Sequence, residues 1–328
     1  MATLRAGYTP VLFAFLSAST FAQSNYLFSA PNMAFGVQPR NELRATQFYN
    51  NPSLEIIDGG PTIVLAGPRF PAVLSGSQAS LANIVNGVTP ITGTQVLFVN
   101  PGLRAADYAL LQQGSAPGGV LHNFAQSGGV LVLLLSPIYA ISDGPGVISN
   151  TMTQNIAPGG LDLIVDMDSS GFFNPPDGHI AQQITDPTHP YITAAAGGTP
   201  LTNAHFVNLF DRGGPMQDPR QTSFGILDTS TLSGASNLRN VVRGVNAPGL
   251  PDGTTFLEYS FGNGTVIATT LAIGLSSGNS FSPPAAFEPQ DNLFYYSATI
   301  VPEPATFALL ALGGAALGLP RRRAARQA

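Results

Sequence analysis

The sequence predicts an α/β domain whose sheet is partly parallel and ends in an antiparallel hairpin. Residues 95–135 follow the order strand, helix, strand, which is typical of a βαβ unit with two buried parallel strands. Two apolar runs at 256–261 and 265–271 flank Asn263-Gly264, a dipeptide that suits a type I′ hairpin turn. The chain has 328 residues, of which 44% are hydrophobic, so it can bury a sizeable core.

Short apolar runs separated by Gly, Pro and Asn predict the remaining strands. Outside the hairpin, the clearest runs are 62–66, 95–100, 130–135, 161–165, 224–227 and 240–244.

Helical patterns are fewer than strand patterns. Residues 77–86 place Leu81, Ile84 and Val85 on one face, which predicts a short amphipathic helix. Residues 105–113 and 120–126 form a broken helical pair, and the pair ends at Ser127-Gly128-Gly129, a stop signal before the next strand.

The ends of the chain differ from its middle in composition. Residues 1–22 hold one Arg, an apolar run and then small residues, the layout of a secretory signal peptide; the alternative is a first core helix. Residues 23–58 show no sustained period and are interpreted as an N-terminal extension or an irregular first hairpin. The α/β domain is therefore expected at 59–300 and a separate tail at 301–328.

Charge and composition exclude several classes of function. Cysteine and lysine are absent, which excludes disulfides, thiolate metal sites, cysteine nucleophiles and Schiff-base chemistry. Residues 23–301 carry 8 Arg against 17 acidic residues, a net charge of −9. Such a body repels phosphate backbones, so no nucleic-acid partner is expected.

The tail at 301–328 combines three features in a fixed order. Pro302, Glu303 and Pro304 precede an apolar run at 305–319, and Arg321, Arg322 and Arg323 follow it. The run predicts a transmembrane helix of about 22 Å, short for a bilayer core, with the arginines as a cytoplasmic stop-transfer signal. With the signal peptide, this order predicts export of the body across the inner membrane.

This tail resembles the PEP-CTERM sorting tail of Gram-negative bacteria. The resemblance implies that the membrane protease exosortase recognises Pro302, Glu303 and Pro304, and that the apolar span is cut or exchanged afterwards. The protein would be membrane-anchored before processing and then secreted or held at the cell surface. The alternative is a plain single-span membrane anchor.

The body resembles the class I glutamine amidotransferase-like fold, a flavodoxin-like α/β domain. The segments that carry the resemblance are QVLFVNPG at 95, LHNFAQSGGVLVLLLS at 121, ITDPTHPYI at 184 and FGNGTVIATT at 261, followed by DNLFYYSATI at 291. The catalytic cysteine of that fold is missing, no histidine lies near the last strands, and the chain has no G-x-S-x-G pattern. Ser136 remains as a replacement nucleophile, against a simple loop serine, and no enzymatic activity is expected.

One acidic segment has the spacing of a calcium loop. Oxygen-bearing side chains fall at loop positions 1, 3, 5, 9 and 12, and Gly171 occupies position 6. Phe173 at position 8, the short Asp at position 12 and Pro175-Pro176 depart from the EF-hand pattern, so a turn before a proline-rich loop is the alternative. The candidate Ca²⁺ ligands are Asp166, Asp168, Ser170, Asn174 and Asp177.

Two further groups have a functional and a structural interpretation. Asp177, His179, Asp186 and His189 could ligate zinc, but their spacing fixes no geometry, and a rigid turn with Asp186 capping its own backbone is favoured. Aromatic residues in predicted loops could stack on sugars, although anchoring of the loops is favoured because Trp is absent. These aromatic residues are Tyr139, Phe172, Phe173 and Tyr191.

These features together predict an exported cell-envelope or matrix protein sorted by exosortase. Its body is expected to be a non-catalytic binding or structural domain linked to extracellular polysaccharide. The alternative is an envelope hydrolase that acts on carbohydrate or ester bonds with a carboxylate pair such as Asp166 and Asp168.

Overall fold

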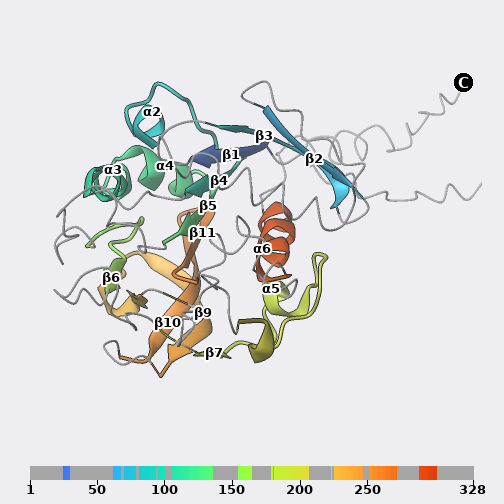
Figure 1. Cartoon of the computed structure of the whole chain (residues 1–328). Helices are drawn as coiled ribbons and strands as arrows, with labels where there is room; N and C mark the ends of the chain where they lie inside the picture. The colour runs from blue at the N-terminus through green and yellow to red at the C-terminus, as the bar shows by residue number, and fades with distance from the viewer. Residues whose placement is uncertain are drawn as a thin grey trace, which may run out of the picture.

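The chain forms one large mixed sheet with helices on both faces, and a small two-stranded sheet beside it (Figure 1). The large sheet has nine strands in the order β2-β3-β1-β4-β5-β11-β10-β9-β7, and the small sheet pairs β6 with β8. The structure is a computed structural model that describes residues 25–29, 62–67, 70–78, 81–93, 95–99, 105–135, 154–164, 179, 181–206, 223, 225–246, 251–271 and 288–300.

The element bounds follow the chain from the N-terminus. The strands are β1 (Asn25–Ser29), β2 (Thr62–Gly67), β3 (Phe70–Gln78), β4 (Gln95–Val99), β5 (Val130–Leu134), β6 (Asp162–Ile164), β7 (Ala181–Ile184), β8 (Ile226–Asp228), β9 (Ala235–Val245), β10 (Gly253–Phe261) and β11 (Gly264–Thr269). The helices are α2 (Leu81–Val85), α3 (Ala105–Ser115), α4 (Val120–Gln126), α5 (Pro190–Thr193) and α6 (Glu288–Thr299), with the 3₁₀ turns η3 (Asn203–Phe206) and η4 (Thr229–Thr231).

The predicted βαβ unit is confirmed. β4 and β5 pair in parallel, with Val96 opposite Val130 and Val99 opposite Leu133, and α3 and α4 connect them. β5 also pairs in parallel with β11, and β4 pairs in parallel with β1. The middle of the sheet is therefore parallel, whereas β10, β9 and β7 continue it in antiparallel pairs. The α/β class and the mixed sheet agree with the prediction.

Strand β1 lies inside the segment that the sequence analysis interprets as an N-terminal extension. Its residues Tyr26–Phe28 pair with β3 on one side and with β4 on the other.

The helix predicted at 77–86 is shorter than expected, because Ser77 and Gln78 end β3 and α2 begins at Leu81. The predicted apolar face of that helix is correct, since Leu81, Ile84 and Val85 are all buried.

The predicted C-terminal hairpin is confirmed, but its turn differs from the prediction. Phe261 pairs with Gly264, so the two loop residues are Gly262 and Asn263. The positive φ falls at Gly262 (+61°), whereas Asn263 does not have one. A type I′ turn needs positive φ at both positions, and the pattern seen here is that of a type II′ turn.

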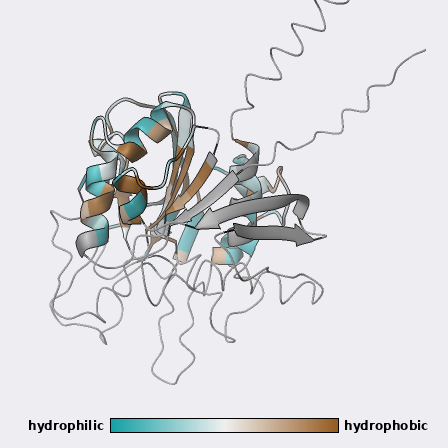
Figure 2. Cartoon of the chain, turned by 90° about the horizontal axis from the view of Figure 1, so that it is seen from above, coloured by the Kyte–Doolittle hydropathy of each residue, from teal (hydrophilic) through white to brown (hydrophobic). Residues whose placement is uncertain are grey.

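The parallel strands separate two hydrophobic cores. On β5, Val130 and Val132 face the core formed with α5 and α6, while Leu131 and Leu133 face the core formed with α2, α3 and α4. All four side chains are fully buried, and each contributes about 1.5–3 kcal/mol relative to an exposed side chain. Apolar residues, brown in Figure 2, run along the central strands.

Several sequence predictions fall on residues outside the described ranges. Within those ranges, no helix has the length and hydropathy needed to span a bilayer. The signal peptide at 1–22, the tail at 301–328 with its helix at 305–319, and the calcium loop lie outside the described residues. The same holds for Ser136, Tyr139, Phe172, Phe173, Pro302, Glu303, Pro304, Arg321, Arg322 and Arg323.

Candidate functional site

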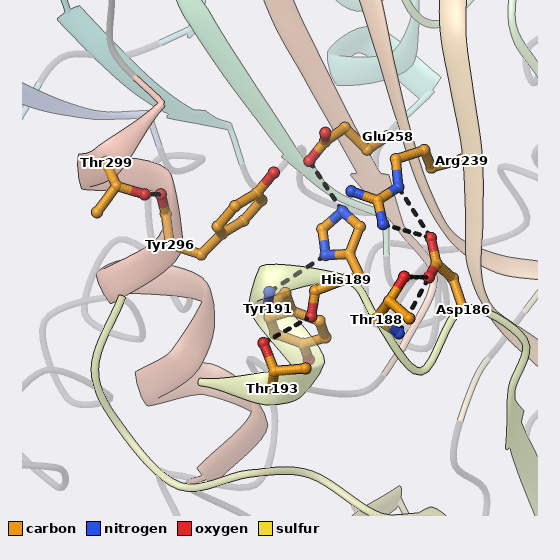
Figure 3. Close-up of polar contacts among 9 residues, drawn as sticks. All are labelled: Asp186, Thr188, His189, Tyr191, Thr193, Arg239, Glu258, Tyr296 and Thr299. Atoms are coloured by element: carbon orange, nitrogen blue, oxygen red, sulfur yellow. Dashed lines mark hydrogen bonds and ion pairs between the residues drawn. The ribbon is translucent and has the colours of Figure 1, made fainter. Parts of the chain in front are cut away.

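A group of polar contacts surrounds the turn that leads into α5 (Figure 3). The turn begins at Asp186, whose Oδ1 accepts hydrogen bonds from the Thr188 N–H at 3.1 Å and the Thr188 hydroxyl at 2.8 Å. This is the predicted arrangement in which an aspartate caps its own backbone, and it is confirmed. The turn places His189 immediately before the first residue of α5.

Arg239 joins this turn to the sheet. Its Nε and Nη2 atoms contact Asp186 Oδ2 at 2.8 and 2.6 Å, and Arg239 lies directly opposite Glu258 in the β9–β10 ladder. Burial acts to raise the pKa of Asp186, but hydrogen bonds from Thr188 and Arg239 and the guanidinium charge outweigh it, so the pKa is lowered. The carboxylate of Asp186 therefore stays charged and holds the turn against β9.

His189 is fully buried, and its two ring nitrogens face different groups. Nδ1 accepts the Tyr191 N–H at 3.2 Å, which caps α5, so the proton of the neutral ring lies on Nε2. Nε2 faces Glu258 Oε2 at 3.3 Å, although neither atom has an aligned hydrogen bond to another described residue. The ring also packs edge-on against Tyr296 at 4.9 Å between centroids. His189 therefore has no free nitrogen with which to accept a proton from a substrate.

Tyr296 brings α6 into the same group. Burial is the main reason that the pKa of its hydroxyl is raised, and the charge of Glu258 and a hydrogen bond to it add to the effect. The hydroxyl thus stays protonated and acts as a donor beside a carboxylate that is only 13% exposed. Asp186, His189, Arg239, Glu258 and Tyr296, here named the His189 cluster, join α5 and α6 to β9 and β10.

A second polar group links β7 and β10 across β9. His179 Nδ1 and Ser223 Oγ are 2.9 Å apart, and His179 Nε2 lies 3.1 Å from the Pro251 carbonyl oxygen. Gln182 Nε2 donates to Ser223 Oγ at 2.9 Å, and the Thr255 hydroxyl donates to Gln182 Oε1. The distance between Ser223 and His179 suits a nucleophile and its base. Both residues have 0% exposure, however, and the hydrogen-bond network occupies the serine, so the group ties the backbone together instead.

We expect the free energy of unfolding to fall as the pH is lowered below about 6.5. Burial lowers the pKa of His179, although the Pro251 carbonyl and Asp252 act to raise it. Between this lowered pKa and 6.5, the unfolded chain binds a proton that the folded chain does not, so stability rises with pH across that window. Urea unfolding at pH 7, 6 and 5 should show this slope, and His179→Gln should flatten it. An equal slope in both proteins would contradict the assignment, and His122→Gln serves as the control.

The zinc interpretation receives no support from the described members of the proposed group. His179, Asp186 and His189 contact Ser223, Arg239 and Glu258 respectively. Among the described residues, no three His, Cys, Asp or Glu side chains gather closely enough to hold a metal ion. Asp177 lies outside the described residues, as do the four other candidate calcium ligands, and the calcium loop stays a prediction.

The sugar-stacking interpretation is wrong for Tyr191. Its side chain is fully buried and stacks on Phe256 with 4.4 Å between ring centroids, so no ligand can reach its face. The sequence analysis missed Arg239, Glu258, Tyr296 and Asn292 as polar contact residues. A signal was present for Glu258, because it is the one charged residue inside the apolar run at 256–261.

No protein-family model matches the chain, and no curated protein sequence matches it significantly.

Proposed function

We propose that this chain is an exported cell-envelope or matrix protein that is sorted by exosortase, with a non-catalytic body linked to extracellular polysaccharide. The observation that supports this most is the order of Pro302-Glu303-Pro304, the apolar run at 305–319 and the cluster Arg321–Arg323. The signal-peptide layout of residues 1–22 supports export. We also infer that the mixed sheet belongs to the flavodoxin-like class, on the strength of the βαβ unit and helices on both faces.

The contacts of the histidines support a binding or structural role for the body. His179 and His189 are both buried. Both ring nitrogens of His179 lie within hydrogen-bond distance of protein atoms, whereas His189 accepts a backbone N–H at Nδ1 and faces Glu258 with Nε2. His205 is likewise engaged, by Thr202 and Glu288. The hydrolase alternative rests on a carboxylate pair such as Asp166 and Asp168, which lies outside the described residues. A surface partner would meet polar residues on β9 such as Ser236 and Asn240, which are exposed.

We expect a chain truncated after Ile300 to lose its membrane association. Truncation removes the apolar run that anchors the protein, because about 15 apolar residues are the only long run after the body. Fractionation of exported protein should move the truncated chain almost completely into the soluble fraction. A truncated chain that stays as membrane-bound as the full chain would overturn the anchor assignment.

A matched variant separates anchoring from sorting. The triple substitution Pro302→Ala, Glu303→Ala and Pro304→Ala keeps the apolar run, so it should remain in the membrane. In a Gram-negative host that has an exosortase, this variant should also keep its C-terminal segment while the wild-type chain loses it. Equal processing of the two chains would contradict recognition of the tripeptide.

A further inference from the structure

Helix α6 is fixed to the body at three points along its length. At its first residue, Glu288 Oε2 lies 2.8 Å from His205 Nε2, and His205 Nδ1 accepts the Thr202 N–H at 2.8 Å. This arrangement places the proton of the neutral ring on Nε2, the nitrogen that faces the glutamate, although Glu288 Oε2 has no aligned hydrogen bond to another described residue. The start of α6 is thereby attached to the segment that follows α5.

The middle of α6 is fixed by Asn292. Its Nδ2 donates to the carbonyl oxygens of Tyr191 at 2.9 Å and Thr199 at 2.8 Å, and its Oδ1 accepts the Thr199 N–H at 3.1 Å. The side chain is 1% exposed, so these three hydrogen bonds replace water completely. Gly198 permits this close approach, because a Cβ there would collide with Asn292 Oδ1.

The second half of α6 is fixed by packing. Leu293, Tyr295 and Tyr296 are buried in the core that α6 shares with α5, and Ile300 packs against the same core. Tyr296 also contacts the His189 ring, as Figure 3 shows. We name α6 with these three sets of contacts the α6 clasp.

The α6 clasp ends very close to the proposed sorting tripeptide. Ile300 and Pro302 are two residues apart, so at most about 7 Å of extended chain separates the packed end of the body from the tripeptide. A protease that recognises the tripeptide must bind it as an extended segment, which needs free residues on the N-terminal side of Pro302. Only one residue, Val301, lies between the body and the tripeptide on the N-terminal side.

We propose that the last turn of α6 must detach from the body before the tail can be processed, so that the α6 clasp limits the rate of processing. This inference rests on the proposed function, since it assumes that the tail is a substrate of a membrane protease. The rate should then follow the population of chains in which the clasp is open. A loss of the three Asn292 hydrogen bonds should raise that population roughly tenfold or more.

The test uses the full chain with an epitope tag after Ala328, in a Gram-negative host that has an exosortase. The first variant carries about ten Gly and Ser residues between Ile300 and Val301, which span about 17 Å and leave every clasp contact in place. The second variant is Asn292→Ala, and its control is Asn240→Ala, an exposed asparagine on β9. Loss of the tag after a pulse of synthesis measures the processing rate. Hydrogen exchange of the purified chains in detergent measures opening of α6.

We expect the linker variant to lose its tag several-fold faster than wild type, with no change in melting temperature. Asn292→Ala should show faster exchange in α6 and faster loss of the tag, and Asn240→Ala should change neither. An unchanged or slower loss of the tag in the linker variant would overturn the role of the clasp while the sorting assignment stands. Retention of the tag by both wild type and the linker variant would overturn the proposed function, and this inference with it.

Discussion

Gly264→Ala is expected to destabilise the protein by about 3 kcal/mol, because the site has no room for a methyl group. A Cβ at this position would meet the carbonyl oxygens of Ala125 and Gly129 well inside van der Waals contact. Gly264 begins β11, directly after the hairpin turn and against the end of α4. Both opposing atoms belong to the backbone, so no side-chain rotation can relieve the collision.

The backbone around Gly264 is held by hydrogen bonds on both sides. The Thr265 N–H donates to the Gly129 carbonyl at 3.1 Å, and the Asn263 N–H donates to the Gln126 carbonyl at 3.1 Å. β11 then continues in parallel register with β5 from Thr265 opposite Val130. A shift of β11 away from α4 would therefore break the central pairing of the sheet, which is why the cost is expected to be large.

Gly118→Ala is the matched control. Gly118 has a φ of +81°, but a Cβ there would meet no atom within 4 Å. Alanine at this position is therefore destabilised only by the left-handed backbone conformation. That cost is about 1–2 kcal/mol. Urea unfolding followed by circular dichroism would compare the two variants with wild type. If Gly264→Ala lowers the free energy of unfolding by no more than Gly118→Ala does, the backbone at the end of α4 shifts easily to make room for the methyl group.

Gly264 also shows what the sequence could reveal about this fold. Asn263-Gly264 correctly predicts a hairpin, since the flanking apolar runs and the dipeptide are local signals. The glycine is needed for another reason: without a Cβ, Gly264 can lie close to the backbone at the end of α4. That contact involves residues about 140 positions earlier in the chain. β1 was not predicted for a similar reason. Its five residues are too few to show a clear alternation of apolar and polar side chains, and its pairing with β3 and β4 defines the strand.

The same limit applies to the His189 cluster. The Asp186 turn was predictable because its hydrogen bonds reach only to Thr188, two residues further on. The contact between Asp186 and Arg239 spans 53 positions, and no local pattern indicates it. His189 resembled a metal ligand in the sequence because its partner, Glu258, lies in a distant strand.

His189→Ala is expected to cost about 3 kcal/mol or more, because three losses coincide. The Tyr191 N–H loses its acceptor at the start of α5, and the carboxylate of Glu258 loses the group at 3.3 Å that faces it. A cavity also opens beside Tyr296, whose ring lies 4.9 Å from the imidazole. A carboxylate that is only 13% exposed regains little hydration, and the hydrogen bond from Tyr296 does not replace the imidazole, so this loss should be the largest of the three.

A double-mutant cycle with Glu258→Gln tests that ranking. Glutamine at position 258 carries no charge, so in a protein that lacks His189 it should be tolerated better than the carboxylate. The destabilisation by His189→Ala plus that by Glu258→Gln should therefore exceed the destabilisation of the double variant. Arg243→Ala is the control, because its pair with Asp252 is exposed and spans 3.5 Å, and its loss should cost under about 1 kcal/mol. Strictly additive costs would mean that Arg239, opposite Glu258 on β9, neutralises the carboxylate without the histidine. The main role of His189 would then be to cap α5 and fill the space beside Tyr296.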